Sequence, residues 1–233
     1  MLRSRQHRVM LAFYLGLGSA VALLFLKTSR AQQLLTVNMP LLFASAVMMC
    51  VWVMGTRVVF SMPLELRASW IFRVTPVRGG RESLTANRRS LVVLAVAPVW
   101  MASATLLLSI WLWWPVAGHL ILLGLLGLIL VDACLRSFQK IPFTCSYLPG
   151  KSQMHITFLA ALFLTHIIAP GVQIEREALE DPASYVGMLA IFGIAAICAR
   201  LWAIAGAAAL QFEDEAAPVI FALDLHHERA MLR

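Results

Sequence analysis

The chain has 233 residues, of which 61% are hydrophobic and 13% are charged, and its formal net charge is +7. A soluble domain is about one quarter charged, so this composition excludes an ordinary soluble domain. The excess of Lys and Arg is typical of the cytoplasmic loops of a membrane protein. Because the sequence has no basic face with the aromatic or helix-in-groove context of a nucleic-acid-binding protein, it excludes nucleic acid as a partner.

The apolar residues gather into runs that are long enough to cross ~30 Å of hydrocarbon, which takes about 20 residues of helix. We therefore expect an all-α, polytopic bundle of transmembrane helices that forms a single domain over residues 1–233, embedded in the lipid bilayer. The predicted spans are six, in chain order 9–26, 41–60, 91–110, 116–131, 154–169 and 185–210.

The first run resembles the apolar core of a signal peptide, because Arg3, Arg5 and Arg8 precede it. It is long for such a core, and the segment 29–31 is a poor cleavage site, so we interpret it as an uncleaved span. Later in the chain, Pro170 and Gly171 are expected to end the fifth run, and an acidic loop is expected to follow them.

The connections between the runs predict the orientation of the bundle. Lys and Arg concentrate at the start of the chain, in the predicted loops 61–90 and 132–153, and in the tail 211–233. The opposite side would hold only Lys27, Arg30 and Arg176. The positive-inside rule therefore places both termini in the cytoplasm.

Arg200 lies inside the sixth run, where a charged side chain usually faces a cavity, the bundle interior or an acidic partner. Asp132, at the end of the fourth run, lies at a comparable predicted depth. We therefore predict an intramembrane ion pair between Asp132 and Arg200. The alternative is that the long stem of Arg200 lets its guanidinium group reach the lipid headgroups.

The sixth run also contains alanines at intervals of four, which place them on one face of a helix. They form a candidate helix-packing face, either within the chain or against a partner, and they are Ala195, Ala199, Ala203 and Ala207. Gly16 and Ala20 repeat this spacing once in the first run.

No motif predicts an enzyme. The segment 149–152 resembles the end of a phosphate-binding loop, but Cys145 stands where that pattern requires its first glycine. The ionisable residues of the predicted spans are spread over both faces of the membrane and form no convergent cluster; they are His119, Asp132, His155, His166 and Arg200. His155 and His166 are about 16 Å apart along a helix, too far to bind one metal ion. Irregularly spaced cysteines without a CxxC pair indicate no metal site either, so we expect no cofactor.

The predicted loop 132–153 contains proline and aromatic residues, which favour a segment that lies against a surface. It is a candidate docking loop for a partner, with ordinary packing at the membrane interface as the alternative. The residues that would make the contact are Pro142, Phe143, Tyr147, Pro149 and Lys151.

Two stretches, 65–72 and 142–151, resemble parts of uncharacterised bacterial inner-membrane proteins of the ABC exporter permease type. Together they make up 18 of the 233 residues. The resemblance implies a permease subunit in the inner membrane of a bacterium. Such a subunit would work with a separate cytosolic ATPase and with another membrane subunit or a second copy of the chain. A membrane transport component is therefore the first expectation for function. A non-catalytic membrane scaffold is the second, and an intramembrane enzyme that acts on lipid is the third.

Overall fold

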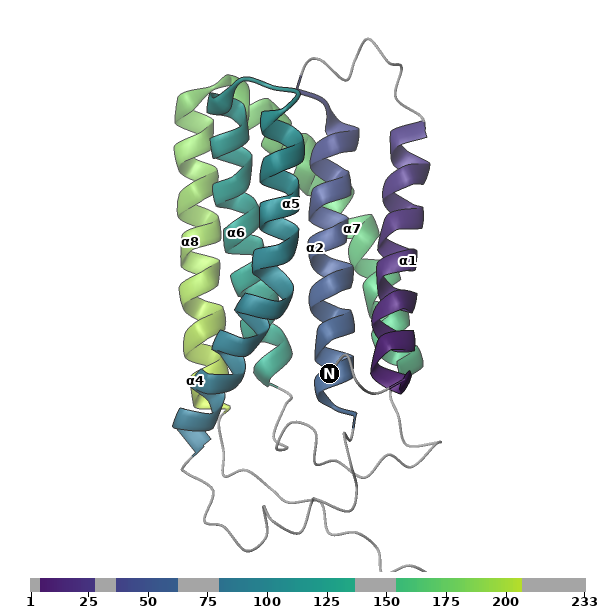
Figure 1. Ribbon diagram of the computed structural model, residues 1–233. Helices are drawn as coiled ribbons and strands as arrows, with labels where there is room; N and C mark the ends of the chain where they lie inside the picture. The colour runs from purple at the N-terminus through teal and green to yellow at the C-terminus, as the bar shows by residue number, and fades with distance from the viewer. Residues whose placement is uncertain (1–4, 28–36, 63–79, 137–153, 207–233) are drawn as a thin grey trace, which may run out of the picture.

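A computed structural model describes residues 5–27, 37–62, 80–136 and 154–206 of the chain (Figure 1). Within these ranges every regular element is helical and no strand occurs, which confirms the predicted all-α bundle. The elements are α1 (Arg5–Lys27), α2 (Met39–Phe60), α4 (Gly80–Leu91), η3 (Val92–Val96), α5 (Ala97–Leu108), α6 (Trp113–Arg136), α7 (Met154–Glu180) and α8 (Pro182–Ala205).

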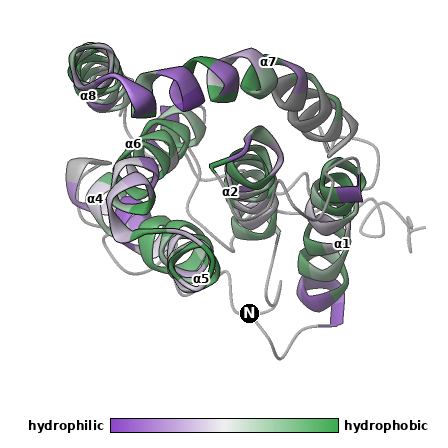
Figure 2. Ribbon diagram, turned by 90° about the horizontal axis from the view of Figure 1, so that it is seen from above, coloured by the Kyte–Doolittle hydropathy of each residue, from purple (hydrophilic) through white to green (hydrophobic). Residues whose placement is uncertain are grey.

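The helix α2 forms the centre of the bundle. Seen from above in Figure 2, α1, α5, α6 and α7 surround it, and α8 lies outside α6. In the most apolar part of α2, 72% of the residues are buried inside the protein, against 6% for α8. Hydrophobic residues on all sides of α2 therefore pack against other helices, whereas most of the apolar surface of α8 faces outward.

Five of the described helices are long and apolar enough to cross a membrane: Arg5–Lys27, Met39–Phe60, Glu82–Leu108, Trp113–Arg136 and Pro182–Ala205. The chain is therefore an integral membrane protein. The fifth predicted run lies in α7, which is not among these five, so a sixth span there stays a prediction. In Figure 1, α7 slants behind α2 from the level at which α1 begins to the level at which α8 begins.

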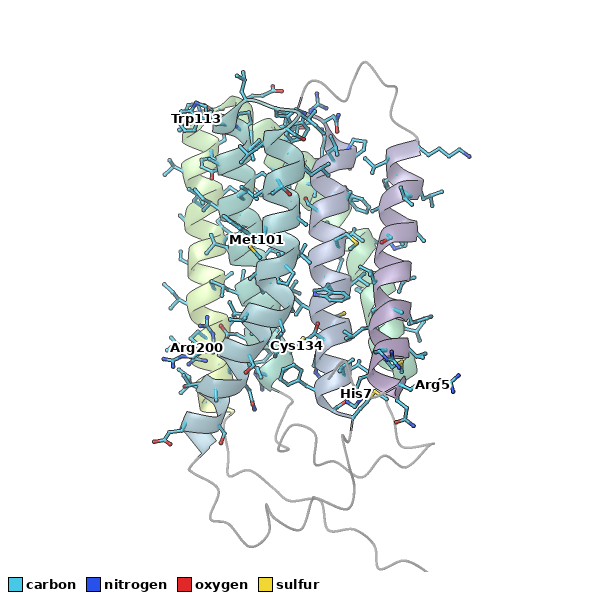
Figure 3. All side chains as sticks on the ribbon, viewed as in Figure 1. Arg5, His7, Met101, Trp113, Cys134 and Arg200 are labelled. Atoms are coloured by element: carbon cyan, nitrogen blue, oxygen red, sulfur yellow. The ribbon has the colours of Figure 1, made fainter. Side chains whose placement is uncertain are left out.

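The start of α1 and the end of α8 lie at the same end of the bundle, as the labels of Arg5 and Arg200 show in Figure 3. Trp113 marks the opposite end. We call these the Arg5 end and the Trp113 end. This arrangement agrees with both termini on one side of a membrane, while the assignment of that side to the cytoplasm stays a prediction.

The third span begins earlier than the sequence predicted. Residues 80–90 belong to the helix formed by α4, η3 and α5, so the prediction of a loop over 61–90 is wrong for this part. The sequence Gly80–Leu91 is strongly polar, which hid it from a search for apolar runs. Residues 63–79 of the predicted loop lie outside the described residues.

A wide turn of π-helix interrupts the third span at η3, where the N–H of Ala97 donates to the carbonyl of Val92. Pro98 follows directly and has no N–H to donate to the carbonyl of Leu94, four residues before it. The indole nitrogen of Trp52 on α2 donates to that carbonyl instead, at 3.2 Å. Proline thus explains the irregularity, and a neighbouring helix supplies the missing donor.

Pro170 does not end the fifth run. The helix α7 continues through Pro170 and Gly171 to Glu180, so the predicted acidic loop is wrong. Proline removes one hydrogen bond from a helix, but a helix between packed neighbours tolerates that loss. The first residue after α7 is Asp181, whose carboxylate accepts hydrogen bonds from the N–H groups of Ala183 and Ser184 and so caps α8. This cap explains why α8 begins at Pro182 rather than at the predicted residue 185.

Candidate functional site

Three polar side chains from three helices meet inside the bundle near its Trp113 end. Nε2 of His119 on α6 lies 2.7 Å from Oγ of Ser45 on α2. Nδ1 of the same ring lies 2.6 Å from Oε1 of Glu175 on α7. The exposed fractions are 8% for Ser45, 1% for His119 and 6% for Glu175. We call this set the Ser45–His119–Glu175 network.

The three helices bring these residues to one depth. Ser45 and His119 each follow the first residue of their helix by six positions, and Glu175 precedes the last residue of α7 by five. At ~1.5 Å per residue, Ser45 and His119 therefore lie about 9 Å inside the Trp113 end of the bundle, and the contact of Glu175 with His119 places Glu175 at the same depth. Charged and polar groups are costly at such a depth unless they are paired, which the network achieves across α2, α6 and α7.

The geometry of the network links the position of one hydroxyl hydrogen to the number of bound protons. Oγ of Ser45 also lies 2.7 Å from the carbonyl oxygen of Leu42. A serine hydroxyl has a single hydrogen, so it donates either to Leu42 or to His119. If it donates to Leu42, Nε2 of His119 must carry a hydrogen to donate to Ser45. The contact between Nδ1 and Glu175 then needs a second hydrogen.

Two protonation states therefore satisfy the network. In the first state the hydroxyl of Ser45 points to Leu42 and the pair of His119 and Glu175 holds the extra proton. That proton lies either on His119, as an imidazolium ion beside a carboxylate, or on Glu175, as a carboxylic acid beside a neutral ring. In the second, one proton has left, the neutral imidazole keeps its hydrogen on Nδ1, and the hydroxyl points to Nε2. Gain or loss of one proton thus reorients a hydroxyl group between α2 and α6.

The order of these contacts is the one found in serine hydrolases, where a histidine links a serine to a carboxylate. The surroundings of Ser45 do not suit that chemistry. Ser45 lies within α2, where the neighbouring backbone N–H groups are engaged in the helix. A hydrolase needs free N–H donors beside its nucleophile to stabilise the oxyanion. The three groups can accommodate either of two proton counts, and the described backbone beside Ser45 offers no free N–H donor for acyl transfer.

The helices α7 and α8 close the network on one side. The hydroxyl of Tyr185 donates to the carbonyl of Gly118 at 3.0 Å, directly beside His119. A Cβ atom added at Gly118 would lie 2.7 Å from Cδ2 of Leu179. Glycine at this position therefore lets α6 approach α7 and α8 closely enough for His119 to reach Glu175.

A second polar cluster lies near the Arg5 end, where the structure brings Asp132 and Arg200 together. Nη1 of Arg200 lies 3.4 Å from Oδ1 of Asp132. Arg88 on α4 makes the shorter contacts, from Nε to Oδ1 at 2.9 Å and from Nη2 to Oδ2 at 3.2 Å. The side chain of Asp132 is 1% exposed, and those of Arg88 and Arg200 are 28% and 27% exposed. Both arginines therefore contact a buried carboxylate.

Arg88 was missed because the sequence placed it in a loop. The network near the Trp113 end was missed for a related reason, since Glu175 was assigned to an acidic loop beyond Pro170. A signal was available: Ile168, Val172 and Glu175 follow one another at intervals of four and three and are all buried. Such spacing is typical of one helix face that continues across the proline.

The other predicted residues are placed as follows. Ala195 and Ala199 are partly buried and Ala203 is buried, on the side of α8 that packs against α6, whereas Ala207 lies outside the described residues. In α1 the packed face contains Tyr14, Gly18 and Ala22, while Gly16 and Ala20 are exposed. His166 is exposed. The side chain of His155 and the whole candidate docking loop, Pro142 to Lys151, lie outside the described residues.

Comparison of the chain with known protein families, with curated proteins and with solved structures found no match.

Proposed function

We propose that the chain is a membrane-embedded transport component that exchanges a proton at the Ser45–His119–Glu175 network. The observation that carries this proposal is the burial of a histidine, a glutamate and a serine in mutual contact between three helices. Ionisable residues inside a membrane are costly, and chains of Asp, Glu and His mark the proton relays of pumps and transporters. Histidine is suited to the task because either ring nitrogen can carry the hydrogen of the neutral ring and both carry one in the cation.

Proton exchange would act on the helix contacts through Ser45. When the network loses a proton, the hydroxyl of Ser45 leaves the carbonyl of Leu42 on its own helix and donates to His119 on α6. The hydrogen bond between α2 and α6 therefore changes its direction with the charge of the network. Because α2 contacts α1, α5, α6 and α7, a change at its contact with α6 can reach most of the bundle.

The proposal is tested with purified protein in vesicles that contain a pH-sensitive dye. A potassium gradient with valinomycin makes the interior negative, and proton entry is then followed as acidification. Vesicles with the protein should acidify faster than empty vesicles, and Glu175→Gln and His119→Gln should reduce the rate to that of empty vesicles. Glu180→Gln changes an exposed carboxylate on the same helix and is the matched control.

Equal acidification with and without the protein contradicts proton transport by this chain. Acidification that Glu175→Gln leaves unchanged contradicts the role of the network. Either result favours the second function, a membrane scaffold. One observation supports a scaffold: the network joins α2, α6 and α7, and each contact between its nitrogen and oxygen atoms is within hydrogen-bonding distance.

A cytosolic ATPase as partner, docked at residues 142–151, is a separate proposal that rests on the resemblance to exporter permeases. Tagged purification in mild detergent, with identification of the proteins that co-purify, tests it. A stoichiometric ATPase that is lost when 142–151 is replaced by a Gly/Ser loop supports the proposal. Purification without an ATPase contradicts it and leaves the proton-exchange proposal standing.

A further inference from the structure

We propose that the arginine cluster near the Arg5 end binds the phosphate group of an anionic phospholipid between α4, α6 and α8. Its members are Arg88 on α4, Arg136 on α6 and Arg200 on α8, with Asp132 as the carboxylate between them. This site is separate from the Ser45–His119–Glu175 network, which lies near the opposite end of the bundle.

The charges of the cluster do not balance among its described members. Arg88 and Arg200 share the single carboxylate of Asp132. Arg136 follows Asp132 by one helical turn and so lies on the same face of α6. Two arginines therefore contact the one carboxylate and a third lies one turn away on α6, and a phosphodiester with its single negative charge would offset part of the excess. Arginine binds phosphate oxygens well because its planar group offers two parallel donors.

Arg136 has a donor with no hydrogen-bonding partner among the described residues. Its Nη1 atom is buried and makes no hydrogen bond there. The guanidinium group lies over the ring of Trp202 on α8, 3.3 Å from the ring centroid. Stacking on Trp202 fixes the plane of the guanidinium group and leaves its edge for an acceptor. Arg200 contacts Asp132 and Trp202 contacts Arg136, so both residues of α8 reach α6 through partners that are one helical turn apart.

The position of the cluster favours a lipid over a free ion. Figure 3 shows Arg200 at the level of α4, near the Arg5 end of the spanning helices. Arg200 precedes the last residue of α8 by five positions, about 8 Å along the helix, a distance that the long stem of arginine can span to reach the headgroups. Beside it on α8, Ile197 is 63% exposed and Leu201 is 61% exposed. A lipid whose phosphate contacts Arg200 would lay its acyl chains along these side chains. Basic sites between spanning helices are known to hold anionic lipid headgroups in this way.

The test is native mass spectrometry of the protein taken from micelles that contain equal amounts of phosphatidylglycerol and phosphatidylcholine. The wild-type protein should retain phosphatidylglycerol in preference to phosphatidylcholine. Arg200→Gln keeps the contact of Asp132 with Arg88, and it should lower the retention of phosphatidylglycerol about fivefold, the loss expected for one basic residue at a membrane surface. Arg89→Gln removes an equal charge from an exposed position on α4 and should leave retention unchanged.

A second variant and a competitor complete the test. Asp132→Asn adds to the positive charge of the cluster, so retention of phosphatidylglycerol should stay the same or rise. Inorganic phosphate, added in excess, should not displace the lipid, and displacement would reassign the site to a free anion. Equal retention of the two lipids by the wild-type protein overturns the proposal, whatever the variants do. So does an equal loss in Arg200→Gln and Arg89→Gln, which would indicate general surface charge.

Discussion

Replacement of Arg88 by alanine should destabilise the protein more than replacement of Arg200, although both guanidinium groups contact the same carboxylate. Arg88 makes two hydrogen bonds to Asp132, at 2.9 and 3.2 Å, whereas Arg200 makes one contact at 3.4 Å. A hydrogen bond to a charged group contributes about 1.5–3 kcal/mol. Arg88→Ala leaves the buried carboxylate with one long contact, and loss of such a partner costs about 3–5 kcal/mol. Arg200→Ala leaves the two-bond pair intact and should cost about 1 kcal/mol.

Equilibrium unfolding in mixed micelles of a mild detergent and SDS measures both changes in the free energy of unfolding. Arg89→Ala, at an exposed position on the same helix, is the matched control and should cost less than about 0.5 kcal/mol. Asp132→Ala completes a double-mutant cycle with Arg88→Ala, for which we expect a coupling of about 2 kcal/mol. Equal costs for Arg88→Ala and Arg200→Ala, or strictly additive effects of Arg88→Ala and Asp132→Ala, would refute this reasoning.

Three further predictions follow from local contacts. A Cβ atom at Gly55 would lie 2.6 Å from Cβ of Tyr14, so Gly55→Ala should cost about 1–3 kcal/mol in the same unfolding assay. Gly16→Ala meets nothing within 4 Å and should not destabilise. Trp52→Phe removes the donor to the carbonyl of Leu94 and should cost about 1–2 kcal/mol; Pro98→Ala, which restores a backbone N–H, should reduce that cost. Hydrogen bonds from the side chain and backbone of Ser184 and the backbone of Ala183 lower the pKa of Asp181. The cap is therefore complete above the ordinary pKa of about 4 and is lost as the pH falls below it through the lowered pKa. The protection of amides at the start of α8 against hydrogen exchange, taken relative to the intrinsic rate at each pH, should fall over that range, and in Asp181→Ala it should be low at every pH.

The helix bundle could be predicted from the sequence because the apolar runs are long. The starts of α2 and α8 also carry local signals, although the predicted start of α8 was three residues late. Pro40 and Pro182 stand in the first turn of these helices, and Asn38 and Asp181 cap them. The errors occurred where a local signal was overridden by packing. Pro170 predicts a helix end, but α7 continues through it, and the polar sequence of α4 predicts a loop, but it extends the third span.

The polar clusters were harder to predict, because each of them joins helices that are far apart in the sequence. Arg200 and Asp132 could be proposed as a pair from their similar predicted depths alone. The contact of Glu175 with His119 depends on the path of α7 beyond Pro170, and the proline outweighed the helical spacing of Ile168, Val172 and Glu175 in the prediction. Ser45 carried no signal at all, because a serine inside an apolar helix usually bonds to its own backbone, as it also does here with Leu42.

Infrared spectroscopy of the protein in vesicles, titrated with acid, tests most directly whether the Ser45–His119–Glu175 network exchanges a proton. With labelled histidine, the ring modes of His119 and the carbonyl stretch of a protonated carboxylic acid are assigned by comparison with His119→Gln and Glu175→Gln. We predict that acidification produces a ring-mode or carboxyl signal in the wild-type protein and in Glu180→Gln. The signal should be absent from His119→Gln and altered in Glu175→Gln. Identical titrations of the wild-type protein and His119→Gln, over the pH range in which both stay folded, would contradict the account, because the network would then hold a fixed number of protons.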